Sequence, residues 1–298
     1  MRSGYDCAMK IGMYSMNFGT CADPDISVAV AQYAEAAGFE LVWIGEHVVL
    51  PTHPPEWFTM PHTLPFLDAI VAMTLLAANT SRVKIGSGIL ELPLHHPLLL
   101  AKQFASIDRI SHGRLIVGVG VGYLEPEFKA MGVEMSDRGE RMDEFISAMR
   151  AMWSMPEPEF HGRHVDFEGI DAHPRPTNPA GPPLMIGGLS GLARRRAIRM
   201  GQGWFAYNAT VDWTRDILDV IAKETAEIGR SADLGPLELT IIPAGPFDRS
   251  IADQYAELGV DRVVVLPRPD APTDVPHTPV PFDEIRRTID TISAELDL

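Results

Sequence analysis

The chain has 298 residues, of which 46% are hydrophobic and 22% charged, a composition typical of a globular protein with a sizeable core. Its 40 acidic residues outnumber 25 basic ones, and the formal charge of −15 argues against nucleic acid as a partner. The sequence has no apolar run of roughly 18 residues, no signal-peptide pattern and only two cysteines, so we expect a cytoplasmic protein with neither a membrane span nor a disulfide framework.

The main pattern is an alternation of short β-branched segments with longer amphipathic segments, which predicts repeated βα units and a parallel sheet. Strands are predicted at 10–15, 40–45, 83–89, 114–120, 183–188, 203–206, 237–243 and 262–266. Helices are predicted at 25–37, 65–78, 97–110, 136–153, 191–200, 212–228, 251–258 and 282–296. Pairing each strand with the next helix predicts a single α/β domain, a (β/α)8 TIM barrel over residues 9–298, behind a flexible tail of residues 1–8.

Three predicted loops are long enough to reach over a site at one end of the barrel. Residues 48–63 contain Trp57, Phe58 and several prolines, and we expect this loop to act as a lid. Residues 154–182 are rich in proline and contain EFHGRHVDFEG, which predicts a small hairpin in an ordered insertion rather than a second domain. Residues 267–281 carry too many prolines for a helix or a central strand, so a loop is predicted.

Glu46 and His47 close the second predicted strand. Residues at strand C-termini face the active-site mouth of a barrel, where an acid and an imidazole can bond a polar ring, relay a proton or bind metal. The alternative is a neutral histidine that only bonds a neighbouring loop. No HExxH motif or clear chelating spacing occurs, so metal dependence is not expected, and the absence of GxSxG argues against a serine hydrolase.

Glycines mark the ends of the third, fourth and fifth strands. Ser87, Gly88 and Ile89 end the third, where a glycine indicates either clearance for a flat ring or tight packing at the barrel corner. The fourth ends in GVGVGY, whose Val121 and Gly122 could bring backbone amides near a phosphate; the spacing is not the dinucleotide-binding GxGxxG.

The fifth strand runs into Gly187, Gly188, Leu189 and Ser190 ahead of a predicted helix, a reasonable phosphate cradle because free amides and a hydroxyl point outward together. Arg194, Arg195 and Arg196 follow on that helix. Adjacent helical residues point about 100° apart, so at most one or two of them can face an anionic ligand.

These landmarks together resemble the bacterial luciferase-like monooxygenase superfamily, and more closely its actinobacterial branch that depends on coenzyme F420. The resemblance is carried by AEAAGFELVWIGEHVVLP (34–51), by the segment 81–128 from SRVKIGSGIL to GYLEPEF, by RGERMDEFISAMRAMW (138–153) and by 173–204 with its MIGG turn. It covers most of residues 10–206, and the last third matches only generically.

The resemblance implies a flavin or deazaflavin ring over the third-strand bulge, with a non-prolyl cis peptide between Gly88 and Ile89. It places Val121 and Gly122 on the loop for the cofactor tail, and Gly187, Gly188, Leu189 and Ser190 on the phosphate turn. Glu46 and His47 fall near ring and substrate. Relatives that oxidise sugar phosphates have a glutamate where Tyr123 stands here, which argues against that substrate and leaves His47, Tyr123 and Glu46 as alternative proton donors.

The resemblance therefore implies hydride transfer between coenzyme F420 and a small organic substrate, an activated double bond, carbonyl or imine, in a homodimer. One alternative is a monooxygenase that uses reduced FMN and oxygen. A second is a non-catalytic flavin- or deazaflavin-binding protein, which would keep the glycine turns but lack a competent acid.

Overall fold

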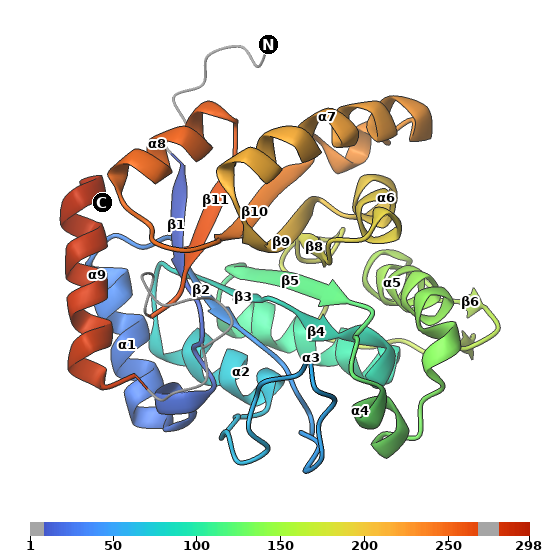
Figure 1. The fold of residues 1–298 in the computed structure, drawn as a ribbon. Coiled ribbons are helices and arrows are strands. Elements are labelled where there is room, and N and C mark those ends of the chain that lie inside the picture. The colour runs from blue at the N-terminus through green and yellow to red at the C-terminus, as the bar shows by residue number, and fades with distance from the viewer. Residues whose placement is uncertain (1–8, 268–279) are drawn as a thin grey trace.

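The computed structural model describes residues 9–267 and 280–298, so the predicted tail 1–8 lies outside the described residues. Parallel strands close into a barrel with helices around it (Figure 1), which confirms the predicted (β/α)8 fold. The order around the barrel is β3-β2-β1-β11-β10-β9-β8-β5, and β3 pairs with β5 to close it. The strands are β1 (Lys10–Met13), β2 (Leu41–Ile44), β3 (Lys84–Ser87), β4 (Leu90–Glu91), β5 (Leu115–Gly120), β8 (Leu184–Gly187), β9 (Gly203–Ala209), β10 (Glu238–Pro243) and β11 (Arg262–Val265).

The helices include every one that the sequence predicts, together with one short extra helix, α4. They are α1 (Pro24–Ala36), α2 (Ala69–Asn79), α3 (Pro97–Ile110), α4 (Glu125–Ala130), α5 (Arg138–Ser154), α6 (Gly191–Met200), α7 (Val211–Ile228), α8 (Arg249–Glu257) and α9 (Phe282–Leu296). Single 3-10 turns are η1 (Gly19–Ala22), η2 (Leu92–Leu94), η3 (Met135–Asp137) and η4 (Ala232–Leu234). In the described part of the chain, no helix combines the length and apolarity needed to cross a bilayer.

Most predicted boundaries differ from the observed ones by one to four residues; the strand predicted over 203–206 extends to Ala209, for example, and that predicted over 10–15 ends at Met13. The helix predicted from 65 begins at Ala69, because the Asp68 carboxylate caps it by accepting from the Val71 amide. The helix predicted from 136 begins at Arg138, after the turn η3. The strand predicted over 83–89 is interrupted at Gly88 and Ile89, and its continuation β4 pairs separately with β5. The predicted hairpin is present as β6 (Phe160–His161) and β7 (Asp166–Phe167).

Two layers of apolar side chains hold the barrel together. The larger lies between the strands and the surrounding helices, and the smaller fills the barrel interior. Trp43 of β2 and Phe205 of β9 meet in the interior with ring centroids 5.5 Å apart. The interior is thus a packed core, which leaves the C-terminal ends of the strands as the place for a site.

Candidate active site

A chain of three hydrogen-bonded side chains lies at the C-terminal ends of β2 and β5. The His47 Nδ1 lies 2.8 Å from Oε2 of Glu127, on the short helix α4, and its Nε2 lies 3.2 Å from the Tyr123 hydroxyl. Glu127 is held in turn by the amides of Val48 and Val49, which donate to its Oε1 at 2.5 and 3.1 Å. Because a carboxylate only accepts hydrogen bonds, this pairing places a proton on Nδ1.

The hydrogen-bonded series Glu127–His47–Tyr123 runs from the interior of the protein to its surface. The side chains of Glu127 and His47 are buried, whereas Tyr123 is 48% exposed. Burial, followed by the charges of Glu91, Glu127 and Tyr207, raises the pKa of Tyr123 above its usual value, so the phenol keeps its proton at neutral pH. The geometry therefore resembles the acid–imidazole–hydroxyl arrangement that moves a proton to or from a substrate.

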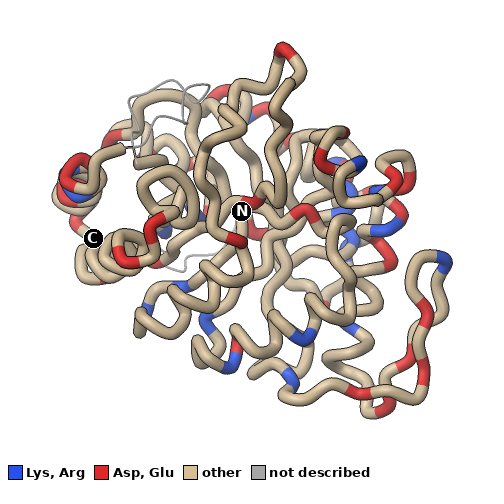
Figure 2. Tube along the Cα trace, turned by 90° about the horizontal axis from the view of Figure 1, so that it is seen from below, with Lys and Arg blue, Asp and Glu red and all other residues tan. Residues whose placement is uncertain are grey.

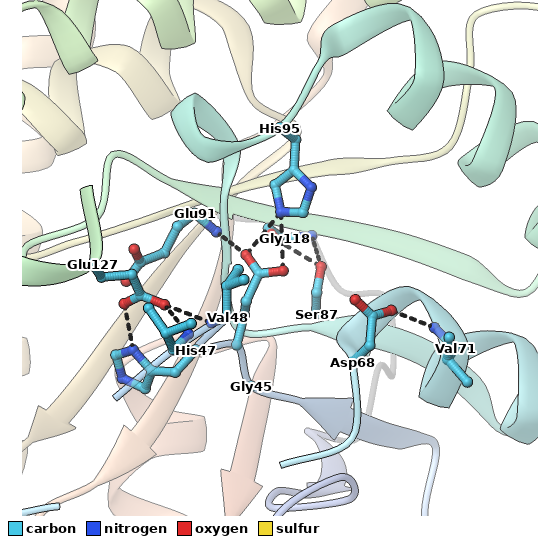
Figure 3. A network of polar contacts seen from close by, with 12 residues as sticks. Gly45, His47, Val48, Asp68, Val71, Ser87, Glu91, His95, Gly118 and Glu127 are labelled. Atoms are coloured by element: carbon cyan, nitrogen blue, oxygen red, sulfur yellow. Dashed lines mark hydrogen bonds and ion pairs between the residues drawn. The ribbon is translucent and has the colours of Figure 1, made fainter. Parts of the chain in front are cut away.

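Glu91, the last residue of β4, lies beside this chain and is almost completely buried (Figure 3). Its Oε2 has no hydrogen-bond partner. Burial, followed by the charges of Glu127 and Glu46, raises the pKa of Glu91 to about 9. Glu91 is therefore a neutral carboxylic acid at pH 7, in contact range of the His47–Glu127 pair.

Glu46 is not part of the chain formed by His47. Its carboxylate accepts from the backbone amide of Glu91 at 2.6 Å and pairs with Nε2 of His95 at 3.0 Å. Burial alone would lower the pKa of His95, but the hydrogen bond and charge of Glu46, with the charge of Asp68, raise it above its usual value. Glu46 thus fixes β4 against the end of β2 and favours the protonated form of His95.

His47, Glu91 and Glu127 also present ligand atoms that all lie within 4.8 Å of one another. A cation would need Nδ1 free and both acids ionised. The short Nδ1–Glu127 hydrogen bond and the neutral Glu91 instead indicate that protons occupy Nδ1 and the Glu91 carboxyl group. We therefore assign no metal to it.

At the strand ends, the space that the glycines leave is filled mainly by other side chains of the protein. A Cβ on Gly86 would lie 2.3 Å from the Trp43 ring, and a Cβ on Gly120 or Gly187 would lie 2.5 Å from the Ile89 side chain. Packing at the barrel corner, one of the two alternatives left open by the sequence, therefore accounts for these positions. The peptide between Gly88 and Ile89 is cis, as the resemblance implies.

Ser87 is completely buried, and its hydroxyl is used inside the barrel wall. It donates to the Gly118 carbonyl at 2.7 Å and accepts from the Gly118 amide at 2.9 Å (Figure 3). Ser87 therefore joins β3 to β5, and only its backbone could face a ligand. Gly122 adopts φ +74°, and a Cβ there would lie 2.8 Å from Oε2 of Glu91, so the absence of a side chain leaves space for that acid.

The turn after β8 leads into the N-terminus of α6. The Ser190 hydroxyl caps this helix by accepting from the Ala193 amide at 3.2 Å, and Gly188 adopts φ +122°. Helix geometry leaves first-turn amides without partners inside the helix, which suits a phosphate. Each of the three arginines that follow already has a carboxylate partner: Arg194 pairs with Glu224, Arg195 with Glu227 and Arg196 with Asp143.

The predicted lid loop packs its aromatic side chains around the His47–Tyr123 contact. Phe58 is buried, with its ring centroid 5.7 Å from that of His47. Trp57 is 61% exposed and lies 5.9 Å from Tyr123, centroid to centroid. Val48, Val49 and Leu189 add further exposed apolar surface at strand ends. Exposed apolar and aromatic faces beside a few buried polar groups fit a planar ring such as a flavin or deazaflavin.

Sequence reasoning placed Glu46, His47 and Tyr123 at the mouth but missed Glu91, His95 and Glu127. All three missed residues lie in the segment 81–128, which carries the family resemblance. The sequence therefore offered one indication of these residues: they are ionisable residues inside a segment that resembles the family. Their role depends on contacts across 45 to 80 positions of sequence, as between Glu46 and Glu91 or His47 and Glu127, which no local pattern reports.

Comparison with known proteins gives a consistent family assignment. A family model described as luciferase-like monooxygenase matches residues 1–248. An uncharacterized protein of Mycobacterium tuberculosis is 32% identical over 251 residues, which cover 79% of this chain and 85% of the relative. The FMNH2-dependent dimethylsulfone monooxygenase of Pseudomonas fluorescens is 32% identical over 215 residues; these cover 71% of this chain but only 56% of that enzyme.

Solved structures with the same fold include a monooxygenase and an F420-dependent dehydrogenase. The monooxygenase RslO1 of Streptomyces bottropensis superposes with a TM-score of 0.76 at 21% identity, covering 97% of this chain and 98% of that one. An F420-dependent secondary alcohol dehydrogenase, in complex with an F420-acetone adduct, superposes with a TM-score of 0.75 at 16% identity, covering 96% and 98%. At these identities the likeness concerns the fold alone.

Proposed function

The chain belongs to the luciferase-like monooxygenase family, and from that premise we propose that it transfers hydride between coenzyme F420 and a small organic substrate. The observation that carries the proposal is the Glu127–His47–Tyr123 chain, because a hydride that adds to one atom of a double bond must be matched by a proton on the other. A non-catalytic binding protein would have no use for such a chain.

The residues proposed to hold the cofactor surround the mouth. The ring would lie over the bulge, and the tail would follow the end of β5 to the α6 N-terminus. The proposed positions are the backbone of Ser87 and Gly88, the Ile89 side chain, Val121, Gly122, Gly187, Gly188, Leu189 and Ser190. The reduced deazaflavin supplies the hydride when it is bound.

The protein's own part is the movement of one proton. In the reducing direction, the Tyr123 hydroxyl gives its proton to the substrate atom next to the carbon that accepts hydride. The phenol oxygen that has given its proton stays 3.2 Å from Nε2 of His47, and Glu127 holds the imidazole in place through Nδ1. Tyr123 is exposed, so solvent can restore the lost proton at the outer end. The oxidising direction reverses each step.

A second candidate function is oxygenation with reduced FMN, and the observation that favours it is the 32% identity to the FMNH2-dependent enzyme of Pseudomonas fluorescens. A fluorescence titration of the purified protein with F420 and, separately, with FMN separates the two. We expect tighter binding of F420. Tight binding of FMN alone would replace the proposed cofactor, and binding of neither would contradict hydride transfer by this site.

A further inference from the structure

The loops at the C-terminal ends of the strands carry almost only acidic charge. The described loops after β1, β2, β4, β5, β8, β9 and β10 contain nine acidic residues and one basic residue, Lys129. Over the whole chain the ratio is far more even, 40 to 25, as the mixture of red and blue positions in Figure 2 shows. Two of the nine, Glu46 and Glu127, are buried beside His47 together with Glu91, the last residue of β4. We call these three residues the acidic wall.

An acidic wall discriminates between hydride acceptors by the charge that each develops. Reduction of a carbonyl group places negative charge on oxygen, which enzymes stabilise with cations or with several donors aimed at that atom. Reduction of an imine proceeds through a protonated nitrogen, which is positive. Carboxylates destabilise the first and stabilise the second, and the described strand-end loops supply no arginine to offset them.

Two exposed aromatic faces meet at the same place. Trp57 and Tyr123 leave 61% and 48% of their surface exposed, and their rings are tilted by 53°. The negative face of an aromatic ring attracts a cation, Trp most strongly. These exposed rings lie beside the acidic wall, an arrangement suited to a planar positively charged group.

Resting on the hydride-transfer function above, we propose that the substrate is an imine, taken up or reduced as its iminium cation, and that Glu91 provides the counter-charge by ionising when the cation binds. A neutral imine takes its proton from Tyr123, whereas an imine that binds as the iminium cation already carries it; in both cases hydride from reduced F420 adds to the carbon, and the C=N π electrons become the nitrogen lone pair of the product amine. Imine, one proton and one hydride thus give the amine.

Glu91 suits this role because of its surroundings. Its Oε2 is buried without a partner, and burial, followed by the charges of Glu127 and Glu46, raises its pKa and keeps it neutral. A cation at the Tyr123 end reverses that balance, so binding should release the Glu91 proton. The titratable groups that face this region are Glu46, Glu127, His47, His95 and Tyr123.

A binding experiment tests the charge preference directly. The probes are 1-methylpyridinium and toluene, which have the same shape and differ by one charge, titrated calorimetrically into the full chain with and without F420. We expect the cation to bind at least tenfold tighter at low salt, an advantage that shrinks as ionic strength rises. At about pH 8, titrations in two buffers of different ionisation enthalpy should show proton release with the cation in the native protein but not in Glu91→Gln.

Two further variants locate the effect. Trp57→Leu should lower the affinity for the cation more than that for toluene, whereas Leu192→Ala, at an exposed apolar position on α6, should change neither. Equal binding of the two probes, or cation binding without proton release from the native protein, would overturn the proposal.

Steady-state turnover tests the imine assignment separately from the hydride-transfer function on which it rests. With reduced F420, the cyclic imine 1-pyrroline should be reduced at least tenfold faster than cyclopentanone, measured as kcat/KM. Faster reduction of the ketone would refute the imine assignment and leave hydride transfer intact. If F420 fails to bind, hydride transfer itself is refuted; if neither compound reacts, the probe titrations decide the charge preference.

Discussion

Replacing Glu91 by Gln should make the free energy of unfolding less sensitive to rising pH. Glutamine keeps the size of the side chain and a hydrogen-bond donor but cannot ionise. In the native protein the pKa of Glu91 is raised to about 9, first by burial and then by Glu127 and Glu46, from an ordinary value of 4.5. The folded state therefore holds a proton that the unfolded state has already lost.

The sign and size of the pH effect on the unfolding free energy follow from this difference in pKa between the folded and unfolded states. A raised pKa gives stability that is complete below the unfolded value and is lost as pH rises toward the folded value, at up to about 1.4 kcal/mol per pH unit. Between pH 6 and pH 8 the native protein should therefore lose roughly 2 to 3 kcal/mol of unfolding free energy relative to Glu91→Gln.

Urea unfolding of both proteins at several pH values measures this quantity, because other titrating groups cancel in the difference between them. Glu125→Gln is the matched control, since Glu125 is exposed at the start of α4, and its difference from the native protein should stay flat. A flat difference for Glu91→Gln as well would show that Glu91 is ionised in the folded protein, and would remove the basis for its proposed role.

Three other variants test the site and its support. His47→Gln should keep F420 affinity but lower turnover by roughly 10²- to 10⁴-fold, seen by pairing a binding titration with steady-state rates; unchanged turnover would refute its role in proton transfer. Tyr123→Phe should lower kcat more than it changes KM, and an unaltered kcat would move the proton donor elsewhere. Gly122→Ala should cost roughly 1 to 3 kcal/mol in urea unfolding, because φ is +74° and the new Cβ would meet Phe128 and Glu91. Gly132→Ala, at φ +69° with open space around it, should cost less and isolates the crowding.

The fold could be predicted from sequence because its signals are local and repeat. Apolar strands such as 262–265, and helix starts such as Asp23 before Pro24, define their own boundaries within a few residues. One error arose where a boundary depends on a distant partner. The third strand breaks at Gly88, where the hydroxyl of Tyr14, the residue after β1, donates to the Gly88 carbonyl at 2.9 Å; no pattern within residues 83–89 indicates that contact.

The site was predictable only in part, for the same reason. The barrel rule places His47 and Tyr123 at one mouth, and the structure brings them into contact. The partner of each acid could not be read from position alone. Glu46, adjacent to His47 in sequence, faces a different histidine, His95, while the acid that holds His47 comes from α4. Successive residues at a strand end point to opposite sides, so neighbours in sequence join different networks.

The glycine-rich strand ends also show why the site could be predicted only in part. A glycine leaves space, but the sequence does not say what occupies it. Here Ile89 fills the space above Gly120 and Gly187, and the indole of Trp43 fills the space at Gly86 and Gly88. The floor of the mouth is thus the half-buried Ile89 side chain, with the glycines one layer below it. A planar ring bound over the bulge would rest on that side chain, so the glycines would serve the cofactor by positioning Ile89.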